Sequence, residues 1–295
     1  MIRYCGYLLL LIFLIGCDEQ QSTDREFKLS EEFKNYWYSG TAEITSYDLK
    51  QARYGEIRDG EAVLIFVTED FLPKEQVKAN AQNDKNISVL KLNSTKKFLT
   101  GIYPYSIMES TFFPLNGKEH ALKVSASVQE WCGQVYMQLN NRNKFEITGH
   151  SYFQGEADQE TKLEKVNLEN ELWTRLRLDH ENLPVGEFKM IPSFEYLRLR
   201  HQPVKPYEAY AEYYTDEDLN IYSLEYPQLK RSLKIYFSRT FPYTIEKWEE
   251  SSTSGFGENQ KILTTRATKK QSIKTDYWNK NSNKNLPLRE KLELN

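Results

Sequence analysis

The stretch from Leu122 to Gln129 alternates apolar and polar residues without a break, and this alternation is the feature that most constrains the fold. Leu122, Val124, Ala126 and Val128 are separated by lysine, serine or glutamine. A repeat of two residues is the period of a half-buried β-strand. Strand-like segments recur along the chain, which has 295 residues and is 14% aromatic, enough apolar material for a substantial core. The sequence therefore predicts a β-rich α+β protein.

The pattern changes between residues 157 and 180, where a single amphipathic helix is expected. Thr161 and Glu164 have the spacing of a capping box. Three leucines then repeat every four residues, and a proline and a glycine end the segment; these are Leu168, Leu172, Leu176, Pro184 and Gly186. The predicted architecture is a curved antiparallel sheet or open barrel-like fold with this helix at its centre.

Shorter signals place individual turns and strands. Asp59-Gly60 between two apolar runs predicts a tight hairpin turn. Residues 33–38 are expected to form an aromatic entry segment with a short helix, and "FKMIPSFEYLRLR" (188–200) is expected to continue as strand. "IYPYSI" (102–107) resembles "TFPYTI" (240–245), which raises the alternative of two similar halves, with chance in a tyrosine-rich chain as the other explanation.

The N-terminus has the layout of a secretory signal. Arg3 precedes an apolar run that is too short to span a bilayer, and Leu14-Ile15-Gly16-Cys17 resembles the bacterial lipobox. Cleavage would remove residues 1–16 and leave a lipid on Cys17, with palmitate among the acyl chains, so that the protein is anchored in the cell envelope, most simply at the outer membrane. The acidic residues that follow resemble the surface-export signal of Bacteroidetes lipoproteins. An ordinary signal peptide or a short core helix is the alternative.

These signals divide the chain into four parts. Residues 1–16 form the signal peptide, and residues 17–32 form the lipidated cysteine and a polar tether. Residues 33–278 form a single β-rich domain, whose halves would be 33–155 and 185–278 around the helix at 157–180. Residues 279–295 form a polar C-terminal tail.

Charge argues against one class of partner. The formal net charge is -3, and acidic and basic residues are interspersed. No cationic stripe is present that could replace counterions on a phosphate backbone, so nucleic-acid binding is disfavoured.

Cys132, in "VQEWCGQVYMQLN" (128–140), is the one thiol that signal cleavage and lipidation would leave free. Residue 135 is valine, so the spacing of a redox dithiol is missing. Apolar residues change from even to odd positions around Cys132-Gly133, which predicts a buried thiol at a β-bulge. The alternative is a catalytic thiol, with Glu130 and either His120 or His150 as partners.

Other motifs are near misses. Gly149-His150-Ser151-Tyr152 begins like a nucleophile elbow, but Phe153 stands where the final glycine is needed. Asp216, Asp218 and Asn220 have calcium-loop spacing without the required glycine and glutamate at the later positions. The sequence therefore indicates no catalytic residue, no cofactor and no metal site.

Several long strings carry a family resemblance: "YWYSGTAEITSYDLKQARYGEIRDGEAVLIFVTEDF", "TGIYPYS", "HALKVSASVQEWCGQVYMQLN" and "IPSFEYLRLRH". Together they resemble a group of flavobacterial and related Bacteroidetes lipoproteins, from about Phe33 to the C-terminal "LPLREKLEL". Members of that group often carry the automatic name septum formation inhibitor Maf, whereas true Maf proteins are soluble nucleotide pyrophosphatases with a Ser-x-Arg-Arg start that is missing here. The resemblance implies an envelope lipoprotein and no catalytic residue.

Two functional classes follow from these observations. The first is a membrane-anchored, non-catalytic module that binds an apolar ligand, a glycan or a partner protein with its aromatic-rich sheet. The second is a hydrolase or transferase that acts on envelope material with a site near Cys132. We expect the binding module, in which most aromatic residues fill the core.

Overall fold

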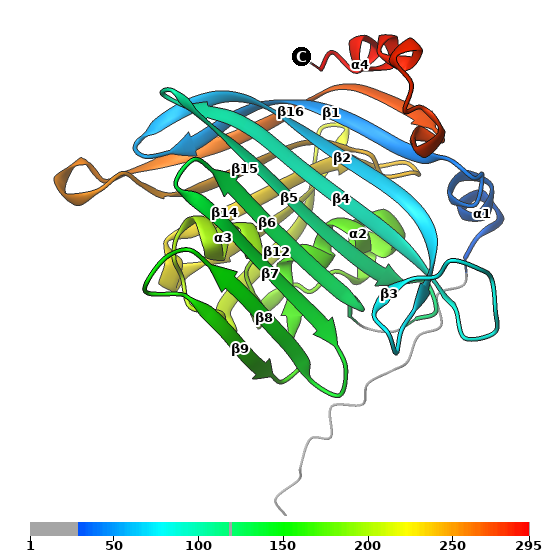
Figure 1. Cartoon of the computed structure of the whole chain (residues 1–295), viewed down its shortest axis with the longest axis horizontal. Coiled ribbons are helices and arrows are strands. Elements are labelled where there is room, and N and C mark those ends of the chain that lie inside the picture. Colours follow the sequence, from blue (N-terminus) through cyan, green and yellow to red (C-terminus); the bar gives the residue numbers. More distant parts are fainter. Residues whose placement is uncertain (1–28, 118–119, 295) are drawn as a thin grey trace, which may run out of the picture.

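Residues 29–117 and 120–294 are described by a computed structural model of the chain, shown in Figure 1. Its strands are β1 (Ala42–Arg53), β2 (Glu56–Leu72), β3 (Val77–Lys78), β4 (Ile87–Thr100), β5 (Tyr103–Pro114), β6 (Lys123–Glu130), β7 (Gly133–Asn141), β8 (Phe145–Ser151), β9 (Asp158–Leu163), β10 (Asn167–Leu168), β11 (Gly186–Ile191), β12 (Tyr207–Asp216), β13 (Leu219–Tyr226), β14 (Arg231–Ser238), β15 (Ile245–Ser254) and β16 (Lys261–Thr275). Its α-helices are α1 (Glu31–Trp37), α2 (Glu169–Asp179), α3 (Phe194–Leu199) and α4 (Pro287–Lys291).

The strands of the described residues form one open, curved sheet. Its order is β10-β11-β12-β13-β14-β15-β16-β1-β2-β4-β5-β6-β7-β8-β9, with β3 added to β2. Neighbouring strands are antiparallel except β10 and β11, which are parallel. Each half of the sheet is a meander, and the two meanders meet where β16 pairs with β1. The β-rich fold with an open curved sheet is confirmed.

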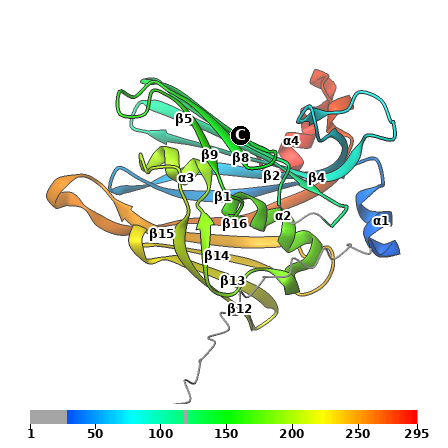
Figure 2. The same ribbon diagram turned by 90° about the horizontal axis from the view of Figure 1, so that it is seen from below.

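Curvature brings the two halves of the sheet around the helices. Figure 2 shows α2 and α3 between an upper layer that contains β4 and β5 and a lower layer that contains β13 to β16. Leu172 and Leu176 of α2 and Leu197 of α3 are completely buried, and the core cluster includes residues of both layers. Burial of one leucine side chain contributes about 2 kcal/mol, so the helices give the concave face the apolar partner that it needs.

The predicted helix starts too early in the chain. Residues 158–163 form the edge strand β9, in which Thr161 pairs with Ile147, and α2 begins only at Glu169. The carboxylate of Glu171 accepts the N–H of Leu168 at 3.3 Å, so the observed capping pair lies seven residues beyond Thr161 and Glu164. The leucine spacing was the reliable part of the pattern.

Asp59-Gly60 does not form a turn, so the predicted hairpin is wrong at this point. The turn lies at Tyr54-Gly55, and β2 continues through Gly60 opposite Phe98 of β4. A Cβ at residue 60 would lie 2.3 Å from the carbonyl oxygen of Lys97. Glycine is therefore required for the close approach of two strands.

Two further segments differ from the prediction. Ser193 accepts the N–H of Tyr196 at 3.2 Å and starts α3, so the second half of "FKMIPSFEYLRLR" is helix. The expected polar tail folds back on the sheet, where Leu292 is buried against β1 and its carbonyl accepts the Ser46 hydroxyl at 2.5 Å. Residues 33–37 form most of α1, as expected.

The two similar strings occupy different positions in the sheet. Residues 102–107 lead into β5, which is the fourth strand from the β1–β16 seam, whereas residues 240–245 lead into β15, the second strand on the other side. The similarity therefore does not mark equivalent positions in two repeats.

The predicted signal peptide and the predicted lipidation site, Cys17, lie outside the described residues. No helix within residues 29–117 and 120–294 is both long enough and apolar enough to cross a bilayer.

Candidate functional site

Cys132 lies at the tip of a hairpin and is exposed. β6 ends at Glu130 and β7 begins at Gly133, so Trp131 and Cys132 form a two-residue turn. The predicted buried thiol at a bulge is therefore wrong, because a turn reverses the chain and shifts the apolar phase in the same way as an inserted residue. A Cβ on Gly133 would lie 2.7 Å from the ring of Tyr152, which explains the glycine.

The chemistry of this thiol does not suit a nucleophile. A carboxylate oxygen of Glu130 accepts the N–H of Cys132 at 2.7 Å. The hydrogen bond and the charge of Glu130 raise the pKa of the Cys132 thiol. Reactive thiols need the opposite shift, which a nearby cation or a helix N-terminus provides.

The two histidines considered as catalytic partners of Cys132 lie against carboxylates instead. Nδ1 of His120 lies 3.0 Å from Glu171 on α2, and Nδ1 of His150 lies 2.9 Å from Asp158. His120 precedes β6 and Cys132 follows it, so the eight residues of that strand, about 26 Å, separate them. Among the described residues no group of three His, Cys, Asp or Glu could hold a metal ion.

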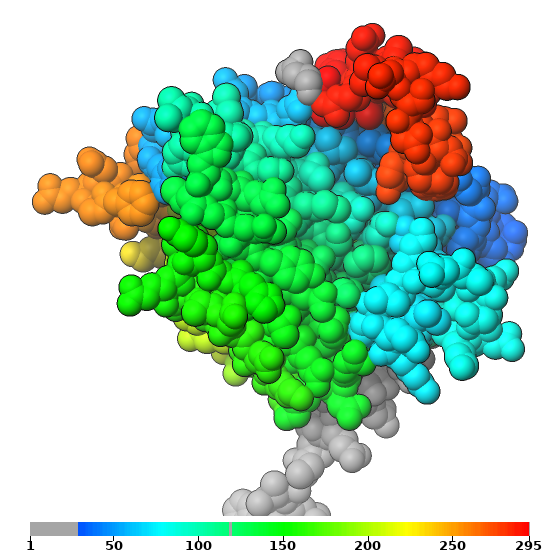
Figure 3. Space-filling model, viewed as in Figure 1, coloured from blue at the N-terminus to red at the C-terminus, as the bar shows by residue number. Residues whose placement is uncertain are grey.

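Large apolar side chains gather at the end of the sheet where Cys132 lies. Strands β1, β4, β6, β8 and β15 run in the same direction, so the turns that follow them share this end. The side chains there are highly exposed: Ile102 83%, Phe256 71%, Trp131 68%, Tyr152 68% and Leu99 59%. We call these five residues the rim. Figure 3 shows the β15–β16 loop, in orange, projecting from this end, with α1, in blue, on the other side.

Ring contacts connect the rim across neighbouring hairpins. Phe256 stacks on Tyr54 with 5.6 Å between ring centroids, and Tyr54 lies edge-on to Tyr105 at 6.5 Å. Tyr103 lies 6.0 Å from Tyr105 and 6.3 Å from Trp131. One aromatic row therefore joins four hairpins through ring contacts.

Arg53 holds the base of this row. Its guanidinium lies 4.2 Å from the ring centroid of Tyr54 and donates to the hydroxyls of Tyr54 and Tyr105 at 3.0 Å. It also donates at 2.7 Å to the carbonyl of Leu199, the last residue of α3. The row is thus connected to α3 inside the sheet as well as to the strands.

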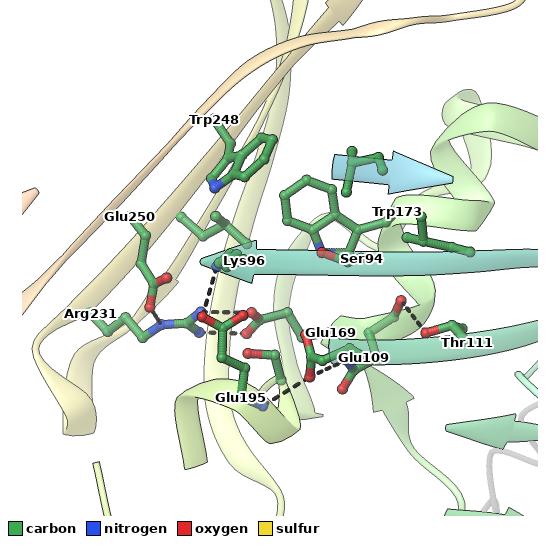
Figure 4. Close-up of a pocket in the computed structure, with 15 residues that line it drawn as sticks. Ser94, Lys96, Glu109, Thr111, Glu169, Trp173, Glu195, Arg231, Trp248 and Glu250 are labelled. Atoms are coloured by element: carbon green, nitrogen blue, oxygen red, sulfur yellow. Dashed lines mark hydrogen bonds and ion pairs between the residues drawn. The ribbon is translucent and has the colours of Figure 1, made fainter. Parts of the chain in front are cut away.

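The second candidate site is a small polar cavity inside the curved sheet, shown in Figure 4. Trp173 and Trp248 form one side of it, with rings nearly perpendicular and 5.4 Å apart, and charged side chains form the other. Its volume of about 30 Å³ corresponds to one or two water molecules. Ligand pockets for small molecules are about tenfold larger, so this cavity is a polar core.

Ion pairs inside the cavity connect both halves of the sheet. Lys96 of β4 donates to Glu195 of α3 at 2.8 Å. The guanidinium of Arg231 on β14 donates through two nitrogens to Glu169 of α2, at 2.5 and 2.6 Å. Its Nε donates to Glu250 of β15 at 2.7 Å. Loss of one partner of such a pair would leave an uncompensated buried charge, so each pair requires the elements that carry it to stay together.

Glu109 is a further carboxylate beside these ion pairs. Its Oε1 accepts from the Asn170 amide at 2.9 Å and from the N–H of Glu195 at 2.8 Å. Burial, and then the negative charge of Glu195, raise the pKa of Glu109 from 4.5 to about 7. The interior therefore takes up a proton as the pH falls below neutral.

Neither the rim nor the interior ion pairs were identified from the sequence. A signal for the rim was available, because Ile102, Trp131 and Phe256 each stand within two residues of a turn glycine: Gly101, Gly133, Gly255 and Gly257. Connecting segments run over the surface, so large apolar residues at such positions are commonly exposed. The buried pairs join residues that are 19, 62 and 99 positions apart, so they leave no local pattern.

Comparison with protein-family models, with curated proteins and with solved structures finds no match to this chain.

Proposed function

We propose that this protein is a lipid-anchored lipoprotein of the bacterial cell envelope, most simply of the outer membrane, whose domain is a non-catalytic binding module. The rim is its binding face, and the apolar surface of a partner protein is what it binds. The observation that carries this proposal is the exposure of five large apolar side chains on four hairpins at one end of the sheet. Contiguous exposed apolar patches on soluble domains mark interaction sites.

The interior supports an external binding face. The cavity is small and lined by charged groups that pair with one another, so an apolar ligand has no room there. The rim itself combines aliphatic tips with Trp131 and Phe256. Aromatic anchors suit the centre of a protein interface, whereas Ile102 and Leu99 offer a sugar ring neither a flat stacking face nor hydrogen bonds.

The position of α1 gives the module an orientation. α1 precedes the start of β1, and the rim lies beyond its end, so the twelve residues of β1, about 40 Å, separate them. A lipid on Cys17 would therefore hold the α1 end near the membrane. The rim would face away from that membrane, toward a partner in the adjoining space.

Site-specific photo-crosslinking in living cells tests this proposal. A photoreactive amino acid at Trp131 or Phe256 is expected to give one shared protein adduct. The same amino acid at Tyr38 or Trp278, each 45% exposed at the opposite end, is the matched control and is expected to give none. Equal adducts from both ends would refute the assignment of the rim, and lipid adducts alone would replace the protein partner with a membrane.

A further inference from the structure

β12 extends beyond the strand that flanks it and leaves a strand position open. Gly186, the first residue of β11, pairs with Ala211, and the chain before it leaves the sheet at Pro184. Residues 212–216 of β12 pair with β13 on one side. In the described part of the chain no strand pairs with them on the other side. We call residues 212–216 and their free edge the β12 slot.

The β12 slot is open to solvent and bordered by aromatic side chains. A hollow of about 630 Å³ is lined by Val185, Gly186 and residues 210–214. Tyr210 and Tyr214 are 40% and 37% exposed on the outer face of the sheet. Tyr213 lies on the inner face, where its hydroxyl is 3.0 Å from Nδ1 of His180. An unpaired edge of this kind receives an extended peptide as an added strand.

Charge around the slot is strongly negative. β11, β12, β13 and the turn between the last two contain one lysine, Lys189, which lies 3.6 Å from Glu208. They contain seven carboxylates: Glu187, Glu208, Glu212, Asp216, Glu217, Asp218 and Glu225. The hydrogen bond to Glu212 and then its charge raise the pKa of Tyr210, and Glu225 and Glu187 add to the shift. The occupant must therefore carry positive charge.

We propose that the β12 slot binds an extended basic peptide of a partner protein, which adds to the sheet beside residues 212–216. Residues directly opposite each other on neighbouring strands share a face. Alternate residues of the peptide then meet Glu212, Tyr214 and Asp216 on the outer face, which favours lysine or arginine there. The residues between them lie on the inner face near Tyr213 and Val185, which favours aliphatic side chains.

The other free edge of the sheet differs in the relevant chemistry. β9 is the last strand at that edge, so it also presents an unpaired backbone. Its sequence is Asp-Gln-Glu-Thr-Lys-Leu, which has no aromatic side chain and fewer carboxylates than the strands around the slot. Its net negative charge also makes it a poor partner for the slot of a second copy. This inference is independent of the rim, because the slot lies on strands that do not carry it.

The test uses the full-length protein in detergent and a fluorescein-labelled peptide, Lys-Val-Lys-Val-Lys-Val, followed by anisotropy. We expect saturable binding that weakens at high salt. A Lys-Pro-Lys-Pro-Lys-Pro peptide has the same charge but lacks alternate N–H donors, so it should bind at least about tenfold more weakly. An all-glutamate counterpart should not bind. Equal binding of the proline peptide, or no binding of the valine peptide, would overturn the proposal.

Variants locate the site. Glu212→Gln with Asp216→Asn is expected to reduce affinity several-fold, and Glu212→Lys with Asp216→Lys to abolish binding, while thermal melting shows that both proteins remain folded. Asp158→Lys with Glu160→Lys on β9 is the matched control and should bind normally. Hydrogen exchange should show new protection at residues 212–216 when the peptide is bound. Loss of binding in the β9 variant, or normal binding in the lysine variants of Glu212 and Asp216, would overturn the assignment of the edge.

Discussion

Replacement of Glu109 by glutamine should stabilise the protein at alkaline pH and have little effect at acidic pH. The pKa of the Glu109 carboxyl is about 7 in the folded protein and 4.5 without the protein environment. The folded state therefore binds more protons than the unfolded state between these values, so stability falls as the pH rises from about 4.5 to 7 and stays low above it. The difference between 4.5 and about 7 corresponds to roughly 3 to 4 kcal/mol at most, because each pKa unit is worth about 1.4 kcal/mol.

Glutamine keeps the acceptor that Asn170 and the N–H of Glu195 use and removes the charge. In urea denaturation at pH 8 we expect Glu109→Gln to be about 2 to 3 kcal/mol more stable than the natural protein, with an unchanged denaturant slope. At pH 5 the difference should fall below about 1 kcal/mol. Glu160→Gln on the exposed strand β9 is the control, with an effect within about 0.5 kcal/mol at either pH. A gain that is equal at both pH values, or a loss at pH 8, would refute the reasoning.

Other positions make simpler predictions. Arg177 donates two 2.8 Å hydrogen bonds to Glu43 in the core. Arg177→Ala should therefore destabilise the protein by about 3 to 5 kcal/mol in urea denaturation. A loss of stability under about 1 kcal/mol would contradict the buried pair. Cys132→Ser should leave melting temperature and cellular function unchanged, and the natural thiol should react fully with a maleimide in the folded protein; loss of function would favour a catalytic thiol. Gly60→Ala should lower the free energy of unfolding by about 2 kcal/mol or more, because the added Cβ meets a carbonyl oxygen at 2.3 Å. Gly149→Ala is the control: its nearest contact is at 3.9 Å, so no such clash should lower its melting temperature.

The spacing of apolar residues along the chain predicted individual strands and the buried face of one helix correctly. The alternation from Leu122 onward is a strand because one face of the sheet is buried, and Leu172 and Leu176 lie on the buried face of α2. Gly60 shows where such reasoning fails, because Asp-Gly has the composition of a turn while its real constraint is a neighbouring strand. The helix start predicted from Thr161 and Glu164 is wrong for a related reason. These residues follow a capping pattern, but β8 offers this segment a hydrogen-bonding edge and it forms a strand.

The candidate sites depend on contacts that are remote in sequence. A change of phase around Cys132 has two structural explanations, a bulge and a turn, and only the pairing of Val128 with Val135 distinguishes them. Lys96 and Arg231 pair with carboxylates on α3 and α2 that lie 99 and 62 positions away along the chain. The rim forms because the turns of several strands meet at one end of the sheet, and the β12 slot forms because β12 extends beyond β11. Neither arrangement is visible in any single segment of the sequence.

The size of the protein after extraction of cells with a mild detergent tests the central proposal most directly. The natural protein should migrate on native gels as a complex with its partner. A variant in which the rim is made polar, with Ile102→Ser, Trp131→Ser and Phe256→Ser, should migrate as the free protein. A matched variant at the opposite end should keep the complex; its substitutions are Tyr38→Ser, Val77→Ser and Trp278→Ser, at positions that are 45%, 46% and 45% exposed. A rim variant that keeps the complex, or a natural protein that migrates alone, would contradict a binding role for the rim.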